Sequence, residues 1–199
     1  MKSLQLSKPY LLVAVGLPGS GKTFFAKQFS DAFNAPYIDY GYYSDVLGKD
    51  SVREEMMDHI YGLLFRTKQT MVIEGRGSTK AERKELSQMA VKNGYKILFV
   101  WVQTEPSTAE YRAVFAKASA TMNQKQFDRS VDDFENLGAG EPYMVISGKH
   151  TFVSQAKTVL KKLVTERPTT TVTPPGSAPK PTVPRPEPRP NPRGRLNVR

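Results

Sequence analysis

The sequence contains no cysteine, and its apolar runs are short. Without cysteine the chain forms neither a disulfide framework nor a thiolate metal site. The longest early apolar run, LLVAV at residues 11–15, is shorter than the roughly 7–15 residues of a signal-peptide core or the roughly 20 of a membrane helix. We therefore expect a soluble, cytoplasmic protein with no membrane segment. A chain of 199 residues is long enough for one well-packed domain and too short for two of ordinary size.

Acidic residues are also scarce, because 19 of them accompany 29 basic residues and leave a formal net charge of +10. Residues 167–199 hold seven basic residues and one acidic residue, Glu187, and so carry +6 of that charge. The remainder is only mildly basic, and its charge alone does not indicate a nucleic-acid binder. The same 33 residues hold ten of the fifteen prolines and no aromatic residue. We expect a folded domain over residues 1–166 and a disordered Pro/Arg-rich tail over residues 167–199. Two interpretations of the tail stay open: docking to an acidic partner, nucleic acid or Pro-recognising groove, and a solubilising extension without a specific partner.

Strand-like and helix-like patterns alternate along residues 1–166. Strands are predicted at residues 10–15, 37–39, 70–73, 96–102 and 143–146. Helices are predicted at residues 21–33, from 51, at 79–93, 107–117, 125–136 and 151–164, with capping boxes at Ser51/Glu54 and Thr79/Glu82. This alternation predicts an α/β fold with a doubly wound, five-stranded parallel sheet. Such sheets bind ligands at the carboxyl ends of their strands.

A phosphate-binding loop follows the first predicted strand. Residues 16–23, GLPGSGKT, fit the pattern G-x-x-x-x-G-K-[ST] and open an amphipathic helix, which is the context that this motif requires. Backbone N–H groups of such a loop hold a nucleoside triphosphate, its lysine reaches the β- and γ-phosphates, and its hydroxyl residue ligates Mg²⁺. The predicted nucleotide-binding residues are Leu17, Pro18, Gly19, Ser20, Gly21, Lys22 and Thr23, with Thr23 as a metal ligand.

Two carboxylates follow the next two strands. Asp39 ends the second strand and Glu74 ends the third, so the predicted sheet brings both to the edge that carries the phosphate loop. A kinase needs one carboxylate to orient or deprotonate the acceptor hydroxyl and often a second near the metal. The alternative for Asp39 is a cap or turn acid, and for Glu74 a solvated acid at a strand end.

Three stretches, GLPGSGKT, VIEGRGSTKAERKEL and GYKILFVWV, together resemble the small P-loop kinases. The nearest group is the ATP-dependent family that contains the kinase domain of polynucleotide kinase, and zeta-toxin-like and chloramphenicol-phosphotransferase-like kinases are similar in plan. The resemblance covers about residues 9–165 and implies a five-stranded parallel core with phosphoryl transfer from ATP to a hydroxyl. It also implies that Asp39 is the acceptor's base, that Glu74 holds a Mg²⁺-bound water or the substrate, and that Arg112 is a catalytic arginine of a helical lid.

The sequence departs from the family pattern at two of these places. Tyrosines at positions 40, 42 and 43 follow Asp39 instead of a second acid and a basic residue, and Lys117 stands where a second lid arginine is usual. We expect these tyrosines on a loop beside Asp39. Together with Tyr37 they either stack on a base or another flat substrate or pack between helices. Arg83 matches a family arginine and either contacts a phosphate or pairs with Glu82 or Glu85. Arg76 is expected to be a solvated residue, and residues 147–149 are placed near the adenine.

These observations support two hypotheses of different classes. The first is an ATP- and Mg²⁺-dependent kinase that phosphorylates a hydroxyl of a nucleic acid, a nucleotide or a small metabolite. The second is a non-catalytic ATP-binding adaptor whose Pro/Arg tail recruits a partner. A GTPase is disfavoured because the sequence has no N-K-x-D motif, and a transporter ATPase because it has no LSGGQ-like stretch.

Overall fold

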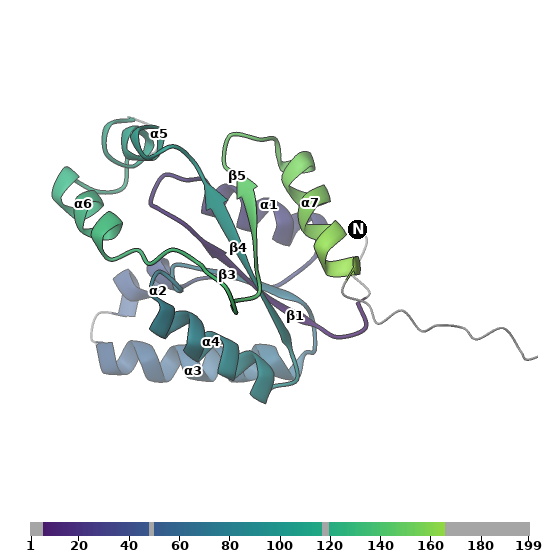
Figure 1. Cartoon of the computed structure of the whole chain (residues 1–199). Coiled ribbons are helices and arrows are strands. Elements are labelled where there is room, and N and C mark those ends of the chain that lie inside the picture. The colour runs from purple at the N-terminus through teal and green to yellow at the C-terminus, as the bar shows by residue number, and fades with distance from the viewer. Residues whose placement is uncertain (1–5, 48–49, 117–119, 166–199) are drawn as a thin grey trace, which may run out of the picture. The chain divides into compact units, whose positions relative to one another are not determined.

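A five-stranded parallel sheet forms the centre of the computed structural model, which describes residues 6–47, 50–116 and 120–165 (Figure 1). The strands are β1 (Tyr10–Val15), β2 (Tyr37–Asp39), β3 (Met71–Glu74), β4 (Lys96–Gln103) and β5 (Tyr143–Ser147). Their order is β2-β3-β1-β4-β5, and every neighbouring pair is parallel. The predicted doubly wound α/β sheet is confirmed. Strand β3 lies one residue later than the predicted range 70–73, and it ends at Glu74, as expected for that carboxylate.

Helices cover both faces of this sheet (Figure 1). Helices α1 (Lys22–Phe33) and α7 (Phe152–Thr165) pack on one face. Helices α3 (Asp50–Arg66) and α4 (Lys80–Lys92) pack on the other. Strand β1 lies between β3 and β4 and is buried along its whole length, which explains its uninterrupted apolar sequence.

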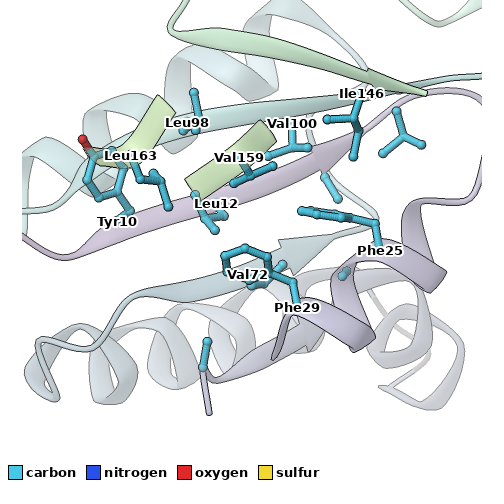
Figure 2. Packing of buried hydrophobic residues seen from close by; sticks show 14 residues of the cluster. Tyr10, Leu12, Phe25, Phe29, Val72, Leu98, Val100, Ile146, Val159 and Leu163 are labelled. Atoms are coloured by element: carbon cyan, nitrogen blue, oxygen red, sulfur yellow. The ribbon is translucent and has the colours of Figure 1, made fainter. Parts of the chain in front are cut away.

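The core on the α1–α7 face is aromatic on one side and aliphatic on the other. Phe25 and Phe29 of α1 and Val159 and Leu163 of α7 pack against Leu12 of β1 (Figure 2). Phe25 and Phe29 are fully buried, with ring centroids 5.5 Å apart. This packing fixes α1 beneath the sheet and therefore fixes the loop that connects β1 to α1.

Helix α2 (Tyr40–Leu47) corrects the expectation that the tyrosines after Asp39 lie on a loop. The Asp39 carboxylate accepts a hydrogen bond from the Tyr42 N–H at 3.2 Å, which is the geometry of a helix N-cap. The sequence contained a signal for this helix, because Asp is a preferred N-cap residue directly before a helix. Helix α3 begins at Asp50, one residue before the predicted cap at Ser51.

The connection between β4 and β5 is helical, as predicted, with different boundaries. Helix α5 (Pro106–Glu110) continues into a π-helix, η1 (Tyr111–Phe115), and α6 (Gln124–Asp132) follows. Helix α6 ends four residues before the predicted Asn136, because the Glu135 N–H donates to the Ser78 carbonyl at 3.0 Å instead of continuing the helix. We call the segment from α5 to α6 the lid segment.

Some predictions fall outside the described residues. These are the domain boundary at residue 166, the Pro/Arg-rich tail at residues 167–199 and the lid residue Lys117. Among the helices of the described ranges, none combines the length and the apolar character that crossing a membrane requires.

Candidate functional site

The phosphate-binding loop lies at the carboxyl end of the central strand and is in close contact with the lid segment. At Gly19 the backbone has a φ of 74°, and a Cβ atom there would come within 2.1 Å of the Ala109 carbonyl oxygen of α5. Only glycine fits such a position without moving the loop or the helix. Helix α5, the first helix of the lid segment, therefore packs directly against the phosphate-binding loop.

Lys22 spans the mouth of this loop. Its Nζ donates to the carbonyl oxygens of Gly16, at 2.9 Å, and Leu17, at 2.8 Å. Burial lowers the pKa of Lys22 to about 8, although the negative charges of Glu74 and Asp39 act in the opposite direction. The ammonium group is thus held among the atoms that a triphosphate would contact, with two carboxylates close enough to stabilise its charge.

The two predicted carboxylates meet across the sheet. Asp39 and Glu74 are register partners in the β2–β3 pair, and Glu74 is also the partner of Ala14 in β1. Val72 packs on the α1 side and Ile73 on the α3–α4 side, so the alternation of β3 places Glu74 on the α1 side. That face receives the first turn of α1, where Lys22 and Thr23 lie.

Glu74 is buried, and only one of its two carboxylate oxygens has a hydrogen-bond partner among the described residues. Its side chain is 3% exposed; Oε1 accepts a hydrogen bond from the Tyr37 hydroxyl, and within the described ranges Oε2 has no hydrogen-bond partner. Burial raises the pKa of Glu74, and the negative charge of Asp39 raises it further. Three effects lower this pKa: the hydrogen bonds from the hydroxyls of Tyr37 and Thr23, and the positive charge of Lys22. An orphaned, buried carboxylate oxygen beside a phosphate loop is a position for a ligand hydrogen or a metal-bound water.

Tyr37 is a site residue that the sequence pattern alone groups only with the other tyrosines. Burial and the hydrogen bond to Glu74 raise the pKa of the Tyr37 hydroxyl far above its usual value. The hydroxyl therefore stays protonated and acts as a hydrogen-bond donor to Glu74. The position of Tyr37 two residues before Asp39 was the available signal, because residues i and i+2 of a strand share a face. Tyr37, Asp39 and Glu74 therefore line one side of the strand ends.

Arg83 has a different role from either one that was expected. It is 1% exposed, and its Nε donates to Glu141 at 2.5 Å, not to Glu82 or Glu85. Its Nη1 donates to the carbonyl oxygens of residues 77, 78 and 135 at 3.2, 3.1 and 2.9 Å. These bonds join the loop after β3 to the segment that returns from α6 to β5. All these contacts of Arg83 are internal, and they fix the chain that follows the lid segment to the loop after β3.

The neighbouring acid and base residues also have defined partners. Thr79 and Glu82 form the predicted capping box of α4, with Thr79 Oγ1 accepting from the Glu82 N–H at 3.2 Å. Arg76 pairs with Glu85 at 2.9 Å, and its guanidinium lies 5.3 Å from the centre of the Tyr40 ring. Arg76 was expected to be solvated; it is partly exposed and paired with Glu85.

Arg112 belongs to η1 and lies on the opposite side of the phosphate loop from the two carboxylates. Its Nη1 is 3.5 Å from the carbonyl oxygen of Gly148, in the loop after β5. A Cβ on Gly148 would lie 1.9 Å from the Ser20 carbonyl oxygen, which also accepts a hydrogen bond from the Thr104 hydroxyl at 2.9 Å. Lid, phosphate loop and the ends of β4 and β5 are thus packed as one unit around residues 19–21.

Two clefts open beside this unit. The lid cleft, of about 630 Å³, lies between the phosphate loop, the residues after β3 and the end of α6; its lining includes Gly16, Lys22, Gly75, Arg76, Asp132 and Asp133. The β4–β5 cleft, of about 660 Å³, is lined on its apolar side by Trp101 and Phe134 and at its rim by Ser147 and Lys149. Both volumes are in the range of small-molecule sites. Two of the three residues expected near the adenine, Ser147 and Lys149, line the second cleft.

Comparisons with solved structures find the same architecture in other proteins. A sugar kinase from Janibacter sp. HTCC2649 is 14% identical, with a TM-score of 0.61 over 79% of this chain and 95% of that one. A gluconokinase from Sinorhizobium meliloti 1021 is 12% identical, with a TM-score of 0.55 over 81% and 94%. The Mycobacterium tuberculosis APS kinase, solved with AMPPNP and APS, is 14% identical, with a TM-score of 0.55 over 79% and 98%. At these identities the likeness establishes the fold.

Sequence comparison gives the family. No curated protein matches the chain. A family model described as an AAA domain, AAA_33, matches residues 11–137, which run from β1 through the phosphate loop, both carboxylates and the lid segment. The chain therefore belongs to this AAA domain family.

Proposed function

We propose that this protein is an ATP- and Mg²⁺-dependent kinase that transfers the γ-phosphate to a hydroxyl group. The observation that carries the proposal is the meeting of Lys22 and Thr23 with Asp39 and Glu74 at one edge of the sheet. A phosphate loop alone predicts nucleotide binding, whereas two carboxylates at the same edge supply the groups that position an acceptor and a metal. The likeness to the folds of a sugar kinase, a gluconokinase and an APS kinase supports this reading.

The chemistry assigns a role to each of these side chains. The acceptor hydroxyl oxygen forms a bond to the γ-phosphorus while the bond between that phosphorus and the β,γ-bridging oxygen breaks, so ADP leaves. Asp39 accepts the proton of the acceptor hydroxyl. Lys22 binds the charge that develops on the transferring phosphoryl oxygens, and Arg112 binds the nucleotide from the lid side. The finer resemblance to polynucleotide kinase and zeta-toxin-like proteins would fit this scheme and remains a prediction.

Mg²⁺ would be held by the Thr23 hydroxyl and, through a water, by the free Oε2 of Glu74. The residues fit this role because that oxygen is buried and without a hydrogen-bond partner among the described residues. The described ranges contain no cluster of three or more His, Asp or Glu side chains that could hold a metal, so the phosphates would supply most of the ligands. When bound, Mg²⁺ neutralises charge on the phosphate oxygens.

The non-catalytic adaptor is the rival function, and one observation favours it: the Asp39 carboxylate already caps α2. Labelled ATP, Mg²⁺ and a panel of 5′-hydroxyl oligonucleotides, nucleosides, sugars and amino sugars separate the two. A kinase transfers label to at least one class of acceptor, and Lys22→Ala abolishes the transfer. Asp39→Asn should lower the rate about 10²–10⁴-fold, the usual contribution of a general base, with nucleotide affinity unchanged.

Asp31→Asn is the matched control, because Asp31 is an exposed acid on α1 and lies in neither the lid cleft nor the β4–β5 cleft. Its transfer rate should equal that of the unaltered protein. Lys22-dependent ATP binding without transfer to any acceptor would reject the kinase in favour of the adaptor.

A further inference from the structure

A further cleft, of about 340 Å³, lies between α3 and α4 beside the start of α2, and we call it the α3–α4 cleft. Its lining residues come from these three helices and from the loop after β3: Tyr40, Glu54, Met57, Asp58, Arg76, Glu85, Leu86 and Met89. Its volume is at the lower end of the range of small-molecule sites, about 300–1,000 Å³. None of the roles proposed above for ATP and Mg²⁺ uses this cleft.

The α3–α4 cleft adjoins the lid cleft, because Arg76 lines both. The lid cleft, on the other side of Arg76, contains Lys22 of the phosphate loop. A Cβ on Gly75 would lie 3.3 Å from the Tyr40 Cβ, so the end of β3 contacts the start of α2. A ligand in the α3–α4 cleft would therefore lie beside the residues that follow the two strand-end carboxylates, next to the place of phosphoryl transfer.

A buried phenol points toward this cleft. Tyr61 is 1% exposed, and among the described residues no group accepts a hydrogen bond from its hydroxyl. Burial raises the pKa of Tyr61 to about 12, so the hydroxyl keeps its proton. The charge and the N–H groups of Arg76 lower this pKa, whereas Tyr40 and Asp58 raise it, which places the hydroxyl beside three residues that line the cleft. Tyr61 also shares a face of α3 with Met57 and Asp58.

The Tyr61 hydroxyl is a sign of something that enters the cleft. A buried donor without a hydrogen-bond acceptor is unfavourable, and phenylalanine would fill the same space without burying one. Arg76 does not solve the problem, because a guanidinium only donates. The phenol proton therefore indicates an oxygen that comes from the cleft, which belongs either to a ligand or to a water molecule.

The cleft presents both hydrogen-bond donors and hydrogen-bond acceptors. Arg76 bonds to Glu85 through Nη2 at 2.9 Å, and a guanidinium has five N–H donors. Glu54 and Asp58 are exposed and lie one turn apart on α3, and ionised carboxylates only accept. The ring of Tyr40, whose centre is 5.3 Å from the Arg76 guanidinium, adds an apolar face. A ligand of this cleft therefore has to accept and to donate.

Charge narrows the choice of ligand. Three carboxylates and one guanidinium line the cleft, and a second guanidinium, that of Arg53, lies 5.7 Å from the centre of the Tyr40 ring. These surroundings are slightly acidic, which disfavours an anion. An ammonium group only donates, so it would leave the Tyr61 proton without an acceptor and would face Arg76. Of the three groups, only a hydroxyl can serve Tyr61 and Asp58 at once, because it accepts and donates.

We propose that the α3–α4 cleft binds the phosphate acceptor and that this acceptor is a small, neutral polyhydroxyl compound. One of its hydroxyls accepts from Tyr61 and donates to Asp58, and another lies toward the strand-end carboxylates and receives the phosphoryl group. This inference rests on the proposed kinase function and names its substrate class. A polynucleotide is too large for the cleft and carries the wrong charge.

The first test compares substrates that share a skeleton and differ in charge. Glycerol, glycerate and serinol form one set, and glucose, gluconate and glucosamine form another; a 5′-hydroxyl oligonucleotide is the polyanion. ADP release is followed with saturating ATP and Mg²⁺. In at least one set, kcat/KM for the neutral compound should exceed that for both charged compounds and for the oligonucleotide at least tenfold. Without such a preference in either set, the inference is wrong.

Tyr61→Phe tests the residue, because it removes only the hydroxyl. KM for the preferred neutral compound should rise about fivefold, the usual contribution of one hydrogen bond, while kcat stays within about twofold. Tyr95→Phe is the matched control, because Tyr95 is also buried but its hydroxyl has an acceptor, the Leu64 carbonyl oxygen at 3.4 Å. Its KM should equal that of the unaltered protein. An unchanged KM in Tyr61→Phe would mean that water serves the hydroxyl, and would overturn the inference.

Stability distinguishes a ligand-binding hydroxyl from a structural one. Without substrate, the urea midpoint of Tyr61→Phe should equal or exceed that of the unaltered protein, because no described residue accepts from the hydroxyl. The saturating neutral compound should raise the midpoint of the unaltered protein more than that of the variant. A lower midpoint for Tyr61→Phe without substrate would show that the protein itself uses the hydroxyl, and would contradict the inference.

If no compound is phosphorylated while ATP still binds, the proposed kinase function fails separately. Calorimetry with the full chain loaded with a non-hydrolysable ATP analogue then measures binding of the same neutral and charged compounds. Tighter binding of a neutral compound, weakened about fivefold in Tyr61→Phe and unchanged in Tyr95→Phe, would support the cleft as a polyhydroxyl site. Absent binding, or binding that Tyr61→Phe leaves unchanged, would refute it.

Discussion

Replacing Arg83 by methionine is the sharpest test of how the site is held together. The guanidinium donates to Glu141 and to four backbone carbonyls while being almost fully buried, so Met leaves these acceptors without their donor. Breaking a buried ion pair by removing one partner costs about 3–5 kcal/mol. The Glu141 side chain keeps 16% of its surface exposed, which allows water to compensate in part, and we take the lower end, about 3 kcal/mol.

Urea unfolding, followed by far-UV circular dichroism, measures this loss. With a slope of about 2 kcal/mol/M for a domain of this size, the transition midpoint should fall by roughly 1.5 M. The control is Lys149→Ala, which removes the solvent-exposed pair with Glu105 and should leave the midpoint unchanged. A midpoint shift below about 0.5 M in Arg83→Met, together with a large loss of transfer rate, would refute the structural role and favour contact with the substrate.

The pH dependence of stability checks the same contact. Burial raises the pKa of Glu141, but the hydrogen bonds from Arg83 and from the Gly138 N–H outweigh it and hold the pKa below the ordinary value. A carboxyl with a depressed folded-state pKa contributes stability above its unfolded value, about 4.3, and loses it as the pH falls through the folded value. The difference in stability between the unaltered protein and Arg83→Met should therefore narrow below about pH 4.

Three further predictions concern the nucleotide side of the site. Gly148→Ala should weaken binding of a fluorescent ATP analogue at least tenfold, because the added Cβ would collide with the Ser20 carbonyl oxygen. Gly138→Ala is the control, because the space around Gly138 is open and its affinity should be unchanged. Equal affinities of the two variants would contradict the packing described for the loop. ATP affinity should fall about tenfold between pH 7 and pH 9, because Lys22, with a pKa of about 8, loses its charge, and Lys22→Met should show no such fall. Tyr37→Phe removes a hydrogen bond that lowers the pKa of Glu74, so the rising limb of the pH–rate profile should move to higher pH. An unmoved limb would show that Glu74 does not control the rate.

Local patterns were sufficient to predict the sheet and the phosphate loop. The apolar run of β1, the glycine pattern before Lys22 and the capping box of Thr79 and Glu82 each act within a few residues of chain. Parallel strands have their carboxyl ends at one edge, so the joint location of Asp39 and Glu74 followed from topology. The short helix α2 was missed because the tyrosines after Asp39 were interpreted as a loop, although a cap was one of the two roles predicted for Asp39.

What the sequence by itself determined was therefore the fold class, the nucleotide loop and the pair of carboxylates, because their signals are local or follow from strand order. The tertiary structure alone decided which distant side chains meet. Arg83 pairs with Glu141, 58 residues away, and Tyr37 donates to Glu74, 37 residues away. The Arg83–Glu141 pair depends on where the chain returns from the lid segment to the sheet, and the Tyr37–Glu74 bond depends on the pairing of β2 with β3. That return is set by packing and hydrogen bonds between segments far apart in the chain, which no periodicity of a single segment encodes.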